Sequence, residues 1–141
     1  MINQISAQQK ADLFQAACKT QKIGFLLPGN TYRVGCAVLT RKGNIYTGCN
    51  IENSAHTPTV CAERVALFKA YSEEDRDIIA MTVVSEEGGT CCGVCRQTIA
   101  DLAPNMVIIL ADVNQTKEVI TNIDELLPFR WTNPTLPEAS E

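Results

Sequence analysis

Three cysteines and one glutamate constrain the fold of this chain more than any other feature. They lie in two short segments about thirty residues apart, Cys61-Ala62-Glu63 and Cys92-Gly93-Val94-Cys95. Three thiolates can hold a zinc ion in three of its four tetrahedral positions and leave the fourth open for water, which is the catalytic rather than the structural pattern. The fold must therefore bring both segments together, with Glu63 held near the open position.

The residue pattern also matches a known signature. A His or Cys followed by x-Glu, with a later Cys-x-x-Cys, is typical of zinc nucleobase deaminases. Five segments resemble, in order and spacing, the free-nucleoside cytidine deaminases: Tyr32–Gly35, Gly48–Asn53, Cys61–Arg64, Cys92–Gln97 and Glu125–Pro128. The resemblance runs from about residue 10 to about residue 131, which is nearly the whole chain.

The resemblance implies a hydrolase that converts cytidine and deoxycytidine to uridine and deoxyuridine with release of ammonia, in pyrimidine salvage. It implies that Cys61, Cys92 and Cys95 bind one zinc ion per chain. Glu63 would move protons from water to ring N3 and then to the departing amino group. Arg64 is expected to contact the zinc-bound sulfurs, with a solvated helix arginine as the alternative.

Further residues are implied as substrate contacts. Asn50 and Glu52 would bind the sugar hydroxyls, although polar loop residues often only face water. Tyr32 occupies a place where the family commonly has a phenylalanine that stacks on the pyrimidine, and core packing is its competing role. Ala62, between a ligand and Glu63, is also expected at the substrate.

The resembled small cytidine deaminases are homotetramers in which neighbouring chains complete each site. Trp131 fits the position of the aromatic residue that reaches a neighbour's site, and Phe129 is the alternative. The sequence therefore predicts a homotetramer with a small-molecule nucleoside as its substrate.

Two residues depart from the family pattern. His56 stands where an aromatic residue is common, and its spacing to Cys61 argues against a role as a zinc ligand. Cys91 replaces the proline that usually precedes Cys92. Because proline fixes φ near −65°, we expect its loss to leave this rim of the pocket looser or differently shaped.

These departures keep other functions open. The same chemistry could act on N4-substituted cytidines or on nucleosides of the blasticidin S type. A non-catalytic, zinc-stabilised protein is a third possibility, but it would need a fourth protein ligand. Cys91 is badly placed for that, because it is adjacent to Cys92 and neighbouring residues rarely reach one ion with good geometry.

Charge and hydropathy argue against several classes of partner. The net charge of −4 and the dispersed positive residues argue against nucleic acid, whose binding depends on clustered Lys and Arg. No stretch approaches the roughly 20 apolar residues of a membrane span, and no secretory signal is visible. We expect a cytoplasmic protein whose seven cysteines stay reduced. Cys18, Cys36 and Cys49 are expected to be small buried hydrophobic residues.

Hydrophobic periodicity predicts strands that alternate with helices over a single domain of residues 1–141. Helices are expected over about 7–22, from 57–59 onward, over 92–103 and from Asn122 or Asp124 to Pro128. Strands are expected over 34–39, 45–49, 78–84, 106–111 and 117–121. The result is a three-layer α/β/α arrangement around one mixed sheet, and the resemblance implies the five-stranded cytidine-deaminase-like fold. A tail from about residue 132 is expected to be extended and mobile.

Overall fold

A computed structural model describes residues 4–136 of the chain. Within this range five strands form one mixed sheet in the order β2-β1-β3-β4-β5. The strands are β1 (Val34–Thr40), β2 (Ile45–Cys49), β3 (Ile78–Ser85), β4 (Val107–Asp112) and β5 (Glu118–Thr121). β1 is antiparallel to β2 and β3, β3 and β4 are parallel, and β5 is antiparallel to β4. The mixed five-stranded sheet predicted from the sequence is confirmed.

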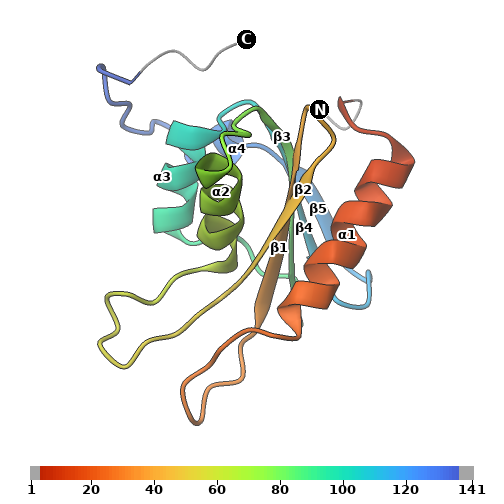
Figure 1. The fold of residues 1–141 in the computed structure, drawn as a ribbon, viewed down its shortest axis with the longest axis vertical. Coiled ribbons are helices and arrows are strands. Elements are labelled where there is room, and N and C mark those ends of the chain that lie inside the picture. Colours follow the sequence, from red (N-terminus) through yellow and green to blue (C-terminus); the bar gives the residue numbers. More distant parts are fainter. Residues whose placement is uncertain (1–3, 137–141) are drawn as a thin grey trace.

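Helices cover both faces of the sheet (Figure 1). The helices are α1 (Ala7–Gln21), α2 (Ala62–Ser72), α3 (Gly93–Leu102) and the short α4 (Ile123–Leu126). Helix α1 lies on one face, over a core that includes Leu13 and Val84. Helices α2 and α3 lie on the other face, over a core that includes Leu67, Met81 and Ile99. The predicted three-layer α/β/α architecture is therefore confirmed.

Local sequence explains several element boundaries. The Ser6 hydroxyl accepts a hydrogen bond from the Gln9 N–H at 3.1 Å, and the Gln9 side chain accepts one from the Ser6 N–H at 2.8 Å. This capping box starts α1 at Ala7. The β1–β2 hairpin turns at Gly43, whose φ of +90° favours glycine.

A buried carboxylate ties this hairpin to the rest of the chain. Asp75 is 3% exposed and lies between α2 and β3. It accepts hydrogen bonds from Thr40 and Asn44, each at 2.8 Å, and from the Tyr46 hydroxyl at 3.3 Å. These bonds lower the pKa of Asp75, with Asn44 as the largest cause.

The predicted start of the second helix at residues 57–59 is wrong. Ile51 and Val60 pair through two backbone hydrogen bonds of 2.9 and 3.0 Å, which keep the chain extended as far as Val60. Helix α2 therefore begins only at Ala62, with Cys61 as its N-cap rather than inside its first turn. Ala66 of this helix faces the core, whereas Phe68 is 47% exposed.

Two glycines allow the helices to approach the sheet closely. A Cβ atom on Gly48 of β2 would lie 2.4 Å from the Ala62 carbonyl oxygen and 2.6 Å from the Ala66 nitrogen. A Cβ atom on Gly35 of β1 would lie 2.0 Å from the Ala17 carbonyl oxygen on the opposite face. Neither position can hold a side chain unless a helix moves. Gly48 thus fixes the height of the first turn of α2 above the sheet.

The end of the described chain forms a turn, in which the Leu136 N–H donates to the Asn133 carbonyl. The predicted mobile tail from about residue 132 continues into residues 137–141, which lie outside the described range. Within residues 4–136, none of the helices combines the length and apolar character that a membrane crossing requires.

Candidate active site

The proposed zinc ligands lie at the N-termini of two helices. Cys61 is the N-cap of α2, Cys92 is the N-cap of α3, and Cys95 lies in the first turn of α3. Both helices begin at the end of the sheet where the loops 22–33 and 50–61 protrude (Figure 1). Helix N-termini present unpaired N–H groups and partial positive charge, and both stabilise thiolates. The Cys95 N–H, for example, donates to the Cys92 sulfur at 3.4 Å.

The three sulfur atoms have the spacing that zinc requires. All three lie within 4.8 Å of one another, and the Cys61 and Cys92 sulfurs are 3.7 Å apart. Tetrahedral zinc with Zn–S bonds of about 2.3 Å needs sulfurs about 3.8 Å apart. Among the described residues these cysteines form the one group of three or more His, Cys, Asp or Glu side chains close enough to share an ion. A three-thiolate zinc ion fits this donor set.

Neighbouring groups favour a thiolate in this cluster. A hydrogen bond from Cys95 and the nearby Arg64 guanidinium lower the pKa of the Cys61 thiol to about 5. The same hydrogen bond, together with burial, raises the pKa of Cys95. Arg64 Nη2 donates to the Cys61 sulfur at 3.6 Å, so the structure places this arginine at the cluster rather than in solvent.

Glu63 is the acidic group beside the cysteines. It lies in the first turn of α2 and is only 4% exposed. Burial raises its pKa, and the negative charge of Cys61 acts in the same direction. The buried Cys91 thiol is a hydrogen-bond partner of the Glu63 carboxylate. A buried carboxyl group with a raised pKa is well suited to exchange protons near neutral pH.

The rim around Cys91 is held firmly. Arg96 donates to the Cys91 carbonyl at 2.9 Å, to the Leu126 carbonyl at 2.6 Å and to the Thr90 hydroxyl at 3.3 Å. One guanidinium thereby joins α3, the loop before it and the end of α4. Arg96 thus restrains the backbone at Cys91, the position where the family commonly has proline.

The two candidate sugar-binding residues already organise the protruding loops. The Asn50 side chain accepts from the Val34 N–H at 2.9 Å and donates to the Tyr32 carbonyl at 2.8 Å. One oxygen of Glu52 accepts from the Leu27 N–H at 2.6 Å and from Asn30 at 2.8 Å. These bonds, with Asn30 as the largest cause, lower the pKa of Glu52 and keep it an ionised acceptor.

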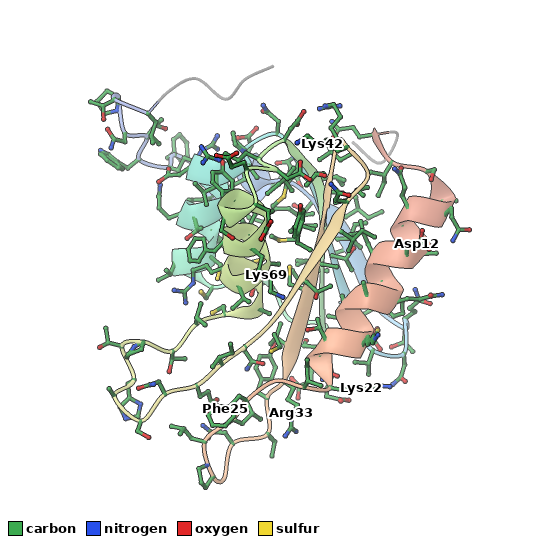
Figure 2. The ribbon with its side chains drawn as sticks, viewed as in Figure 1. Asp12, Lys22, Phe25, Arg33, Lys42 and Lys69 are labelled. Atoms are coloured by element: carbon green, nitrogen blue, oxygen red, sulfur yellow. The ribbon has the colours of Figure 1, made fainter. Side chains whose placement is uncertain are left out.

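Backbone pairing makes these loops one unit. The Phe25 N–H donates to the Asn50 carbonyl at 3.0 Å, and the Glu52 N–H donates to the Phe25 carbonyl at 2.8 Å. Arg33 donates to the Gly24 carbonyl at 3.3 Å. Figure 2 shows Phe25 and Arg33 at the same end of the molecule, on the loop that precedes β1. The loops 22–33 and 50–61 thus form one wall next to the cysteine cluster.

The structure also places the remaining candidates. The Tyr32 side chain is 49% exposed, so its alternative role in core packing is wrong, and its hydroxyl lies against Gly89 in the loop before Cys91. Ala62 is fully buried between Cys61 and Glu63. His56 is exposed with φ +62° and lies outside the metal-binding group, as expected. Trp131 is 66% exposed, and its carbonyl accepts from Gln97 at 3.4 Å.

Sequence reasoning missed the roles of three residues. Gly48 and Arg96 belong to segments that carry the family resemblance, but nothing in a linear sequence showed what they contact. Cys91 departs from the family pattern in sequence, but its contact with Glu63 depends on the tertiary fold. Gly48 and Arg96 lie in motifs but have no role in the proposed chemistry. That combination is the signal that would have predicted a structural role for them.

Comparisons with known proteins agree with this geometry. A family model described as the cytidine and deoxycytidylate deaminase zinc-binding region matches residues 7–111. A cytidine deaminase from Halalkalibacterium halodurans is 41% identical over 112 residues, which are 77% of this chain and 84% of the relative. A blasticidin-S deaminase from Bacillus cereus is 34% identical over 136 residues, 89% of this chain and 94% of the relative.

Solved structures agree as well. The crystal structure of a cytidine deaminase from Burkholderia pseudomallei superposes with a TM-score of 0.80 at 31% identity, covering 90% of this chain and all of that chain. The family match spans the three cysteines and Glu63, whose side chains the fold brings together. On these grounds the chain belongs to the cytidine and deoxycytidylate deaminase zinc-binding family.

Proposed function

We propose that this protein is a zinc-dependent cytidine deaminase that hydrolyses cytidine and deoxycytidine to uridine and deoxyuridine with release of ammonia. The observation that carries this function is the cluster of three sulfurs within 4.8 Å of one another beside a buried glutamate. The sequence identity to cytidine deaminases over most of the chain supports the substrate class.

The chemistry requires two proton transfers. Hydrolysis joins the oxygen of water to C4 of the pyrimidine, breaks the bond from C4 to the amino group, and leaves one proton on N3 and one on ammonia. A zinc ion held by Cys61, Cys92 and Cys95 supplies a Lewis acid that makes water a better nucleophile. Glu63 carries both protons in turn, and its raised pKa lets it accept and release them. Arg64 offsets the negative charge of the thiolates.

We assign the substrate contacts to the wall and rim of the site. Glu52 and Asn50 bind the sugar hydroxyls and Tyr32 stacks on the pyrimidine, whereas Ala62, expected at the base, is fully buried and has no surface free to contact it. The lowered pKa of Glu52 supports its role as an acceptor. The exposure of the Tyr32 ring beside the loop that carries Cys91 and Cys92 supports stacking.

The assembly and location follow the same family expectation. We propose one catalytic domain over residues 1–141 that forms a homotetramer, in which Trp131 reaches a neighbouring chain's site. The exposure of Trp131 and Phe129 supports an aromatic surface for self-association. A thiolate site needs reduced cysteines, so we place the protein in the cytoplasm, in pyrimidine salvage, with neither nucleic acid nor membrane as its partner.

A second candidate is a deaminase of modified cytosine nucleosides, such as N4-substituted cytidines or blasticidin S. The 34% identity to a blasticidin-S deaminase over 89% of this chain favours it. Cys91, at the rim where the family commonly has proline, is the residue through which such breadth could arise.

One experiment tests both candidates. The purified protein is assayed by ultraviolet absorbance against cytidine, deoxycytidine, N4-methylcytidine and blasticidin S, and its zinc is measured by mass spectrometry. We expect about one zinc per chain and turnover of cytidine, both lost in Cys92→Ala but retained in Cys18→Ala, which removes a thiol far from the cluster. Full zinc content and activity in Cys92→Ala would contradict the proposed site.

A further inference from the structure

Two segments that are distant in sequence leave the sheet side by side. β1 and β3 are antiparallel neighbours, and Val34 at the start of β1 is paired with Ser85 at the end of β3. The segment before β1 and the loop after β3 therefore begin at the same edge of the sheet. The first segment carries Tyr32, and the second carries Gly89, two residues before Cys91.

Gly89 leaves room for the end of the Tyr32 side chain. A Cβ atom on Gly89 would lie 2.5 Å from the Tyr32 hydroxyl oxygen and 3.8 Å from its Cζ atom. The backbone itself does not require glycine here. Gly88 has φ +72°, which favours glycine, whereas Gly89 does not adopt a positive φ. The space that a side chain on Gly89 would fill is instead occupied by the Tyr32 phenol.

The backbone is anchored on both sides of this contact. The Gly89 N–H donates to the Ser85 hydroxyl at 3.0 Å, and Ser85 is 1% exposed. On the other side, the Asn50 side chain donates to the Tyr32 carbonyl at 2.8 Å and accepts from the Val34 N–H at 2.9 Å. The Tyr32 ring is therefore the part that would move if an atom were added at Gly89.

We propose that Gly89 is a positioning residue, because the space at its Cα atom sets the angle of the Tyr32 ring and so how tightly the pyrimidine is held. This inference rests on the proposed function, in which Tyr32 stacks on the base. Gly89 lies in the same loop as Cys91 and close to Cys92, so the contact also fixes the ring relative to the cysteine cluster. A stacked ring holds the base equally before and during the reaction, so its displacement raises KM and leaves kcat unchanged.

Gly89→Ala is the direct test. The new methyl group meets the far end of a flexible side chain rather than backbone, so the ring turns away at little cost in stability. We expect KM for cytidine to rise by about 5- to 30-fold, as for the partial loss of one stack between a base and an aromatic ring. kcat and zinc content should stay at their wild-type values. In NMR spectra of isotope-labelled tyrosine rings, the Tyr32 signals should shift, whereas those of Tyr46 and Tyr71 should not.

Two further variants separate this contact from indirect effects. Tyr32→Phe removes the hydroxyl that the methyl group would strike and leaves Cζ in ordinary contact at 3.8 Å. The double variant Gly89→Ala/Tyr32→Phe should therefore have a KM within about twofold of Tyr32→Phe alone. Glu87→Ala introduces the same residue at an exposed position of the same loop and should keep the wild-type KM.

The proposal is overturned if Gly89→Ala leaves either KM or the Tyr32 ring signals unchanged. It is also overturned if the double variant keeps the full rise in KM, or if Gly89→Ala acts by losing zinc. A wild-type protein that does not hydrolyse cytidine would contradict the proposed function instead, and the Tyr32 ring signals would then decide the role of Gly89 by themselves.

Discussion

Replacing Gly48 with alanine tests whether the sheet sets the position of the catalytic helix. The new Cβ atom would lie 2.4 Å from the Ala62 carbonyl oxygen, about 1.0 Å short of ordinary contact at 3.4 Å. Both nearest atoms belong to the backbone of α2, so no side chain can rotate away. The first turn of α2, with Cys61 and Glu63, must move by a distance of this order.

Both stability and catalysis should respond. Overpacking of this kind costs about 1–3 kcal/mol of unfolding free energy, which for a chain of this length lowers Tm by about 3–10 °C. A misplacement of about 1 Å in a catalytic group can cost about 10²-fold in rate. We therefore expect kcat/KM for cytidine to fall by about 10- to 100-fold in Gly48→Ala.

The matched control is Gly35→Ala on the neighbouring strand. Its Cβ atom would collide with α1 at 2.0 Å, on the face away from the cysteines. The Gly35→Ala variant should lose at least as much stability as Gly48→Ala but keep the wild-type kcat/KM per folded molecule. Thermal melts and zinc analysis of both variants give the folded fraction before the activity is measured. If the two variants have equal activity per folded molecule, the claim that Gly48 positions the site is refuted.

Three other predictions concern single side chains. Glu63→Gln should keep its zinc, since it is not a ligand, and lose at least about 100-fold in kcat; activity within a few-fold of wild type would exclude the proton-transfer role. The lowered pKa of Asp75 means that its stabilising effect is present above its unfolded pKa of about 3.9 and is lost as pH falls through the lower folded pKa. Thermal melts between pH 6 and pH 3 should thus show a weaker pH dependence for Asp75→Asn than for wild type, and equal dependence would show that another group is responsible. If Cys91 widens the pocket, Cys91→Pro should lower the ratio of N4-methylcytidine turnover to cytidine turnover. If the wild type accepts both substrates and the variant has the same ratio, another residue is responsible for the broad substrate range.

Local patterns predicted the elements well where local interactions decide them. The start of α1 follows from Ser6 and Gln9, and the strand expected over 78–84 corresponds to β3 (Ile78–Ser85). The start of α2 lies beyond the expected residues 57–59, because the pairing of Ile51 with Val60 keeps that segment extended. That pairing joins residues on either side of an irregular loop, and no periodicity reveals it.

The site shows the same division. The spacing of the cysteines and Glu63 predicted the ligand cluster, which the structure brings together. The restraint of the rim by Arg96 depends on how α3 packs against α4, and the contact between Cys91 and Glu63 depends on how α3 packs against α2. Such contacts join elements that are distant in sequence. The motifs therefore identify Arg96 and Cys91 as residues of the site, but they do not predict which residues these two contact.

The N-cap positions of Cys61 and Cys92 make zinc a component of folding as well as of catalysis. A ligand that binds only the folded state stabilises it by about 1.4 kcal/mol for each tenfold rise in concentration above the dissociation constant. Here two of the three sulfur atoms that would hold the ion belong to Cys61 and Cys92, the N-cap residues of α2 and α3. Chelation should consequently loosen both helix ends at once. The fraction of chains that survive proteolysis would then track the free zinc level, so metal supply could set the abundance of this enzyme without any change in its synthesis.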